Sequence, residues 1–120
     1  MHTYTIRQLR AALDKGEVSS VEVQEYFQKR IETLDPKINS FITTTFEAAK
    51  NAAIEADKAI AKGEQGLLTG IPLAHKDLIS TKGVLTTSAS KMLSNYTPPF
   101  DATLVEKMAK EGVVSLGKLN

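Results

Sequence analysis

The sequence predicts an α/β fold in which N-terminal helices lead into part of a mixed sheet covered by helices. Residues 1–62 carry apolar stripes with helical spacing, and one β-branched and aromatic run at 38–44 predicts a strand among them. Residues 67–120 contain two apolar runs typical of buried strands, separated by a helical pattern. Strand, helix, strand is a unit from which helix-covered sheets are built. We therefore expect one portion of a single domain, mainly helical over 1–62, with 67–120 starting the core sheet.

Helix boundaries follow from capping patterns in the first half. A hydroxyl followed three residues later by Gln or Glu starts helices at Thr5 and Ser19. The first helix is expected to end at Gly16 and the second at Asp35-Pro36, because a residue before proline disfavours helical geometry. A third helix is expected to open at Thr44 and to present a face made mostly of alanine.

The second half carries the two core strands. The first begins after Gly70 and runs through Lys76, and the second covers 113–116. Asp101 is a suitable N-cap for the helix between them, whose inward side is predicted to hold Leu104, Val105 and Met108. No internal repeat, low-complexity tract or linker divides the chain.

Composition limits the classes of function. The chain has 120 residues, 42% of them hydrophobic, and a net charge of +1, which gives no electrostatic reason to propose direct binding to nucleic acid or membranes. The absence of cysteine excludes disulfides, a thiol nucleophile and a thiolate metal site. Neither a signal peptide nor an apolar run long enough to span a membrane is visible, so cytoplasm is the expected location.

The stretch Gly70-Ile-Pro-Leu-Ala-His-Lys76-Asp77 is the most informative part of the sequence. It takes an apolar run from a turn directly into adjacent charges. Two interpretations remain open for Lys76. The strand could simply end there, with its charges in solvent. Alternatively, Lys76 could be held neutral in a buried polar network and act as a proton acceptor, since desolvation favours the neutral form of a lysine.

Other candidate motifs are weak. Strand alternation places His75 on the face opposite Lys76, so packing or exposure is expected for it. His75 and Asp77 together offer two possible metal ligands, fewer than a zinc site uses, and we expect no metal. The run from Gly112 to Lys118 imitates a phosphate-binding loop, but Leu119 stands where a hydroxyl must reach magnesium. The Ser88 and Lys91 spacing is better explained by helix capping or a solvated lysine.

Three segments in order, GIPLAHKD, TKGVLTTSAS and PPFDATLVEKMAKEGVVSLGKLN, resemble the amidase signature family, and the resemblance extends more weakly to the N-terminus. In that family, a lysine at the position of Lys76 is the base of a Ser–cis-Ser–Lys triad. Only this role carries over, because nothing here matches the later Gly/Ser-rich signature that holds the serines. The resemblance thus implies an incomplete amidase signature fold, an N-terminal fragment of a longer enzyme that is inactive alone.

Within the family, the match is closest to the branch that serves as the A subunit of a tRNA-dependent amidotransferase. This implies glutamine as ammonia donor, the B and C subunits as partners, and tRNA reached through the complex. ATP and magnesium would be used by the partner subunit, with no cofactor bound by this chain and no membrane partner. His75 and Leu78 depart from the family pattern, where an apolar residue and Asn are frequent, so the resemblance does not fix the shape of the pocket.

Two alternatives stay open. One is a stand-alone amidase of the same family, acting on aryl or short acyl amides without partner subunits. The other is a non-catalytic, helix-rich interaction module that is complete at residue 120. Against the module stands the buried strand at 113–116, whose edges lack obvious partners within the chain.

Overall fold

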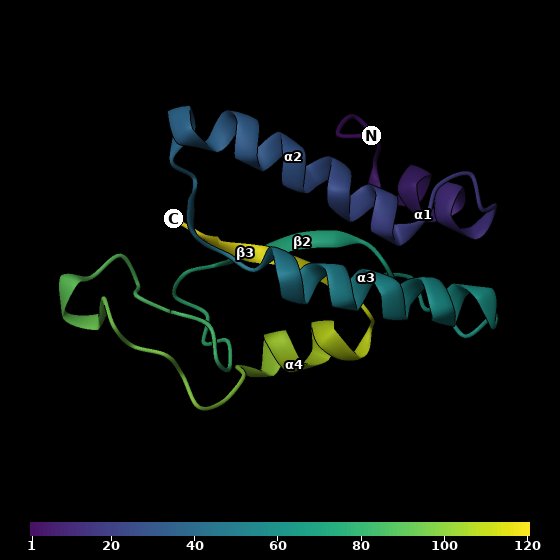
Figure 1. The fold of residues 1–120 in the computed structure, drawn as a ribbon. Helices are drawn as coiled ribbons and strands as arrows, with labels where there is room; N and C mark the ends of the chain where they lie inside the picture. The colour runs from purple at the N-terminus through teal and green to yellow at the C-terminus, as the bar shows by residue number, and fades with distance from the viewer.

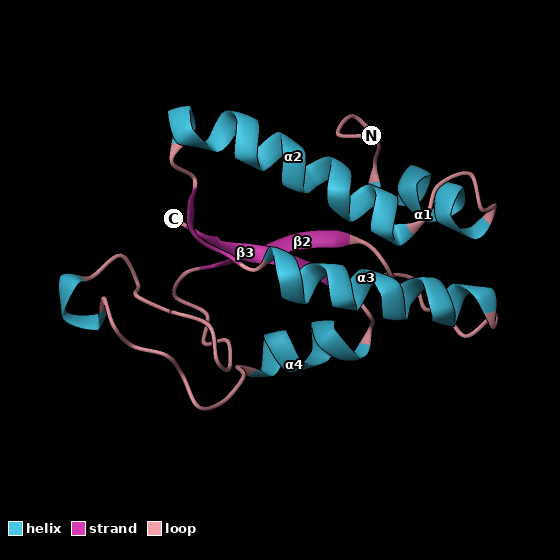
Figure 2. Ribbon diagram, viewed as in Figure 1, coloured by secondary structure: helices cyan, strands magenta, loops and turns pink.

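The computed structural model of the chain describes residues 1–120 and confirms an α/β fold in which helices cover a small mixed sheet (Figures 1 and 2). In Figure 1 the sheet lies between α2 above and α4 below, and α3 runs alongside it. The elements in chain order are α1 (Ile6–Asp14), α2 (Ser20–Ile38), β1 (Phe41–Thr44), α3 (Phe46–Ala61), β2 (Pro72–Lys76), the short 3-10 helix η1 (Lys91–Leu93), α4 (Thr103–Lys110) and β3 (Val114–Leu119).

The strand that comes last in the sequence lies in the middle of the sheet. The strand order is β1-β3-β2, and β3 pairs antiparallel with β1 and parallel with β2. The predicted strand–helix–strand unit is therefore present as β2-α4-β3. The expectation that the final strand lacks partners within the chain is wrong, because both of its edges are paired. The paired edges of this strand therefore do not count against an interaction module.

A register shift changes the direction of one side chain on β3. Leu73 pairs with Ser115, whereas His75, two residues later, pairs with Lys118, three residues later. The extra residue on β3 is a β-bulge, a feature that re-aims side chains and interrupts strict alternation. As a result, Lys118 lines the same cavity as Ser115 and His75.

Both capping boxes of the first half are confirmed. The hydroxyls of Thr5 and Ser19 accept from the third residue of their helices, and those residues return side-chain bonds to the cap backbone. The predicted end of α2 is wrong, because the helix runs through Pro36 to Ile38. Pro36 lies in the last turn, where its missing N–H removes little of the helix, and Asn39 closes the helix in the left-handed conformation.

The start of the third helix is also displaced by one residue. Thr44 belongs to β1, and Thr45 is the N-cap of α3 without a side-chain capping bond. Its hydroxyl instead donates to the Ser115 carbonyl at 3.0 Å, and its amide donates to the Leu116 carbonyl at 3.0 Å. The Thr45 hydroxyl is therefore bonded to the sheet and does not cap the helix. The predicted strand at 38–44 is correspondingly shorter, because Ile38 ends α2.

The predicted cap of the last helix is wrong. Ala102 is the N-cap of α4, and the Asp101 carboxylate accepts from the Lys82 amide at 2.7 Å instead. Asp101 therefore closes the loop that precedes α4 rather than the helix itself. Of the residues expected to point inward, Val105 is buried and Leu104 is exposed.

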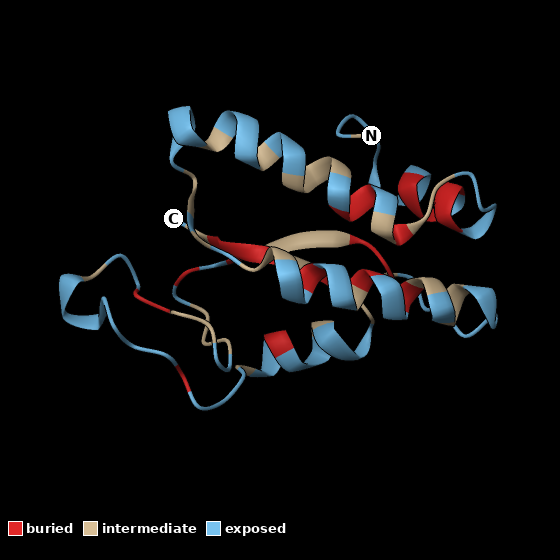
Figure 3. Cartoon of the chain, viewed as in Figure 1, coloured by how far each residue is buried: buried red, intermediate tan, exposed pale blue.

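Two small apolar clusters hold the layers together, and Figure 3 shows buried residues on α1, α2, α3 and β3. Alanines of α3 allow the helix backbone to lie close to β3. The first cluster consists of Leu9, Leu13, Val23 and Ile71, and the second of Ala49, Ala53, Val114 and Leu116. No helix of the chain is long and apolar enough to cross a membrane.

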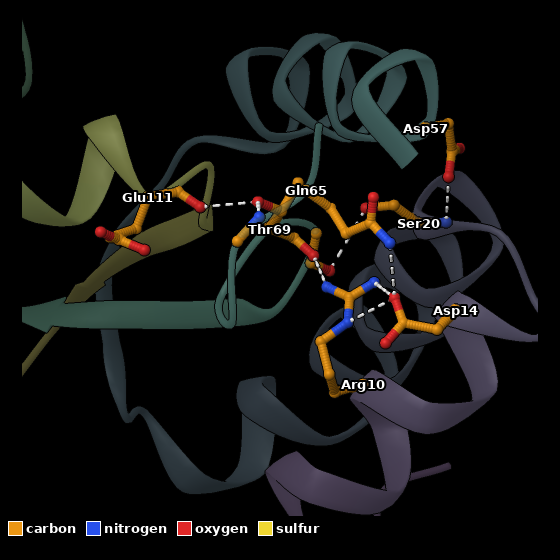
Figure 4. Close-up of polar contacts among 9 residues, drawn as sticks. Arg10, Asp14, Ser20, Asp57, Gln65, Thr69 and Glu111 are labelled. Atoms are coloured by element: carbon orange, nitrogen blue, oxygen red, sulfur yellow. Dashed lines mark hydrogen bonds and ion pairs between the residues drawn. The ribbon is translucent and has the colours of Figure 1, made fainter. Parts of the chain in front are cut away.

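A polar clasp joins α1 to the turns at one end of the sheet (Figure 4). Arg10 donates to the Thr69 carbonyl and pairs with Asp14 at 2.8 Å. The Thr69 hydroxyl donates to the Glu111 carbonyl at 2.9 Å and accepts from the Gly66 amide at 2.9 Å. The clasp thus links the N-terminal helix, the turn before β2 and the turn after α4.

Replacement of Gly117 by alanine tests the close approach of β1 to β3. An added Cβ would lie 2.2 Å from the Thr43 carbonyl oxygen, a backbone atom that cannot rotate away. We expect Gly117→Ala to lower the free energy of unfolding by about 3 kcal/mol in urea titrations. Gly63→Ala is the matched control, because its Cβ would meet nothing within 4 Å and only its positive φ is strained, costing about 1 kcal/mol. Equal losses in both variants would contradict this account.

Candidate functional site

Lys76 is the last residue of β2, at the carboxyl end of a strand that runs parallel to its neighbour. Its side chain is exposed and makes no hydrogen bond or ion pair within residues 1–120. The backbone below it is fixed, because Lys76 pairs with Leu119 and the next amide, that of Asp77, donates to the Leu119 carbonyl at 2.8 Å. Ligands of open α/β sheets bind at this end of the strands.

Lys76 borders a small hollow of about 120 Å³. The floor comes from the ends of β2 and β3 and from β1, and one wall comes from the loop that follows β2. Its lining residues are Ile42, Lys76, Asp77, Leu78, Ser88, Ala89, Leu119 and Asn120. Lys76, Ser88 and Asn120 therefore border one concavity.

The loop wall has an unusual backbone. Ser88 and Ala89 have φ values of 50° and 55°, a left-handed conformation that non-glycine residues rarely adopt. Such residues persist where surrounding bonds fix them, and they gather at functional sites. Here the Ser88 amide donates to the Asp77 carbonyl at 3.0 Å, and the Ala89 amide donates to the Thr87 hydroxyl at 3.1 Å.

Asp77 is buried immediately beside Lys76 in the chain, with 2% of its surface exposed. One carboxylate oxygen, Oδ2, accepts from the Thr87 amide at 3.1 Å and from the Thr87 hydroxyl. Its other oxygen, Oδ1, is buried without a hydrogen-bond partner. This aspartate therefore ties the returning arm of the loop to the end of β2.

Lys118 is the one buried lysine near the site, with 1% of its surface exposed. Its ammonium group donates to the Ile79 carbonyl at 2.5 Å, the Thr81 hydroxyl at 3.1 Å and the Thr86 hydroxyl at 2.8 Å. Burial lowers the pKa of Lys118, and the negative charge of Asp77 opposes that shift. In the sequence, Lys118 stands out only within the rejected phosphate-loop pattern. A lysine inside an apolar strand was the signal that could have identified it.

The two lysines have different chemical capacities. A buried lysine with a shifted pKa is often the candidate base of a site. All three donors of Lys118 are already used by neutral oxygens, however, and its side chain lines the cavity under α4 rather than the hollow beside Lys76. Lys76 has an open amine beside the hollow. The geometry therefore favours Lys76 as the group available to a ligand.

His75 lies on the face opposite Lys76 and is buried, as strand alternation predicts. It lines an apolar cavity of about 230 Å³ under α4, together with Lys118 and Val105. Burial lowers the pKa of His75, and the positive charge of Lys118 adds to this effect. No group of three or more metal-ligating side chains comes together in the structure.

The weak sequence motifs lie in ordinary structure. The Gly112–Lys118 run enters β3 rather than a helix, so it does not have the geometry of a phosphate-binding loop. Ser90 caps η1 by accepting from the Met92 amide at 3.2 Å, and Lys91 is exposed.

Sequence comparisons agree with this fold. The family described as Amidase matches residues 22–120. The A subunit of the glutamyl-tRNA(Gln) amidotransferase from Thioalkalivibrio sulfidiphilus is 55% identical over 120 residues, and that from Methylococcus capsulatus is 52% identical over the same length. All of this chain is covered in each case, but only 25% of the relative. The chain thus spans about a quarter of the length of the curated relatives it matches.

Solved structures of amidases also match the fold of this chain. The native peptide amidase from Stenotrophomonas maltophilia matches with a TM-score of 0.92 and 32% sequence identity. The match covers 98% of this chain and 25% of the peptide amidase. An amidase family protein from Bacillus anthracis matches with a TM-score of 0.90 and 27% identity, over 98% of this chain and 24% of that chain.

The buried imidazole of His75 predicts a pH-dependent stability. Its pKa in the folded state lies below the ordinary value of 6.5, so folding favours the neutral ring. The contribution of His75 is complete above pH 6.5 and is lost as the pH falls toward the folded-state pKa. We expect the free energy of unfolding, measured in urea, to fall between pH 7.5 and 5.5, and to fall less in His75→Leu. His2→Gln keeps the buried ring and should retain the full dependence; an unchanged dependence in His75→Leu would contradict this assignment.

Proposed function

This chain belongs to the amidase signature family, and we propose that it is the part of a glutamine-hydrolysing subunit that carries the catalytic base, Lys76. The subunit would supply ammonia for converting misacylated Glu-tRNA(Gln) into Gln-tRNA(Gln). The observation that carries the proposal is the exposed Lys76 amine at the carboxyl end of β2, beside a hollow, in a chain about half identical to such subunits over its whole length.

The proposed chemistry is covalent acyl transfer. A serine hydroxyl attacks the carboxamide carbon of glutamine, and its proton passes through a second serine to the neutral amine of Lys76. Lys76 returns this proton to the leaving nitrogen, which departs as ammonia and leaves an acyl-serine. Water then hydrolyses the ester to glutamate and restores the serine. Backbone amides would stabilise the tetrahedral oxyanion.

Residues 1–120 would supply only one member of this triad. No Gly/Ser-rich signature for the two serines is present, so the rest of the subunit would have to provide them. We therefore expect residues 1–120 alone to be inactive toward glutamine. Within residues 1–120 the Lys76 side chain is exposed and is not held in a buried polar network. The rest of the subunit, which would bring the serines to it, would therefore also have to supply the burial that favours its neutral form.

The proposal also implies particular partners. The B and C subunits of the amidotransferase would assemble with the complete A subunit. ATP and magnesium would serve the partner subunit, which activates the glutamate on the misacylated tRNA, and tRNA would be reached through the complex. Such a role in translation implies the cytoplasm as the location of the protein.

A stand-alone amidase is the second candidate, favoured by the similarity to the peptide amidase from Stenotrophomonas maltophilia. The base and its chemistry would be the same, and the substrate would differ. Dependence on partner subunits separates the two. Ammonia release from glutamine that requires the B and C subunits supports the amidotransferase, whereas turnover of simple amides by the isolated A subunit supports the second candidate.

Replacement of Lys76 tests the proposed base. The variant is made in a full-length A subunit whose matching quarter carries this sequence, assembled with its partner subunits. We expect Lys76→Ala to lower kcat for ammonia release from glutamine by about 10²–10⁴-fold, because general acid–base catalysis contributes that much. The melting temperature should change little, since the substitution removes no hydrogen bond or ion pair within residues 1–120.

Lys110→Ala is the matched control for loss of a lysine. Its side chain is 74% exposed on α4, away from the hollow beside Lys76, and its ion pair with Glu106 spans 3.7 Å. Exposed pairs of this kind contribute little to stability. The control should retain the parent kcat. Ammonia release by Lys76→Ala at the parent rate would end the assignment of Lys76 as the base.

A further inference from the structure

We propose that Lys118 and Asp77 are positioning residues for Lys76, because together they fix the loop that forms one wall of its hollow. The inference rests on the proposed function and adds two residues to it. The three donors of Lys118 are all used by the loop, and Asp77 is only 2% exposed. Both act through the segment 77–89, which leaves β2 at Lys76 and returns to it at Ser88 and Ala89.

Lys118 holds both arms of this loop from the central strand. The Ile79 carbonyl and the Thr81 hydroxyl belong to the outgoing arm, and the Thr86 hydroxyl belongs to the returning arm. The bulge in β3 directs the Lys118 side chain to this position. One ammonium group thus sets the spacing between the two arms through three directional hydrogen bonds.

Asp77 joins the two ends of the segment 77–89. Its amide is bound to Leu119 of β3, its carbonyl accepts from the Ser88 amide, and its carboxylate accepts from Thr87. Because Asp77 directly follows Lys76, any displacement of the returning arm acts on the backbone that carries the amine. The left-handed pair Ser88–Ala89 is held in place by these bonds and lines the hollow.

Stability alone gives a poor account of these buried charges. An apolar residue of similar volume often stabilises an interior as well as or better than a buried ionic group. Burial of Lys118 is reflected in its lowered pKa, and Asp77 leaves Oδ1 without a partner. These groups instead provide directional hydrogen bonds that fix one geometry of the loop.

The test uses the full-length A subunit with its partner subunits, as for Lys76. Lys118→Met keeps the length of the side chain and removes its three donors. Thr86→Val keeps the shape of the side chain and removes one acceptor, whereas Thr86→Ser keeps the hydroxyl. Asp77→Asn keeps the shape and weakens the acceptor for Thr87. The kcat and KM for ammonia release from glutamine are measured for each variant.

We expect Lys118→Met to lower kcat by about tenfold or more with KM within about twofold, because small displacements of a catalytic group are costly to the chemical step. Thr86→Val and Asp77→Asn should lower kcat several-fold by the same route, and Thr86→Ser should restore the parent kcat. Should Lys118→Met fail to fold, the two Thr86 variants carry the test.

Arg10→Met is the matched control for loss of a buried cation. Arg10 also donates to a backbone carbonyl, that of Thr69, but in the clasp at the other end of β2 (Figure 4). Its replacement should lower the melting temperature while kcat stays at the parent value. A drop in kcat that simply follows lost stability would therefore also occur in Arg10→Met.

Two results would overturn the inference while the proposed function stands. One is a kcat of Lys118→Met and Thr86→Val within twofold of the parent while Lys76→Ala is inactive. The other is an equal loss of kcat in Arg10→Met. A different pattern, in which Lys76→Ala releases ammonia at the parent rate, would reject the proposed function, and this inference with it.

Discussion

The pairing of β3 on both edges is the constraint on which the rest of the structure depends. β1 and β2 do not pair with each other, and within the sheet each pairs only with β3. The apolar side chains of Val114 and Leu116 form the surface on which α3 packs. Gly117 lets the β1 backbone approach closely, and Lys118 fixes the loop after β2. Because these contacts join residues far apart in sequence, the sheet forms only when the last residues of the chain are in place.

Short-range signals in the sequence were sufficient for much of the fold. The capping boxes at Thr5 and Ser19 start α1 and α2 because all of their bonding partners lie within three residues. The apolar runs that became β2 and β3 were recognisable from composition alone. Predictions from neighbouring residues failed where the side chain is bonded to a group far away in the sequence. Thr45 binds the Ser115 carbonyl of β3, and Asp101 binds the Lys82 amide, so neither acts as a helix cap.

The candidate site was predictable only in part, for the same reason. The alternation of β2 correctly separated His75 from Lys76, because it depends on one strand. The central place of β3 and its bulge depend on neighbours that the sequence does not specify. Without the bulge, the side chain of Lys118 would be expected on the opposite face from that of Ser115, and its contacts with the threonines of the loop could not be anticipated.

The loop between β2 and α4 is divided into a tied base and a free tip. The Gly83 amide donates to the Pro98 carbonyl and the Thr86 amide donates to the Tyr96 carbonyl, and residues 91–95 between these bonds are exposed. An insertion at the tip would therefore leave the wall of the hollow unchanged. At Met92, which is 89% exposed within residues 1–120, a peptide tag or a fluorescent label would leave the wall of the hollow unchanged.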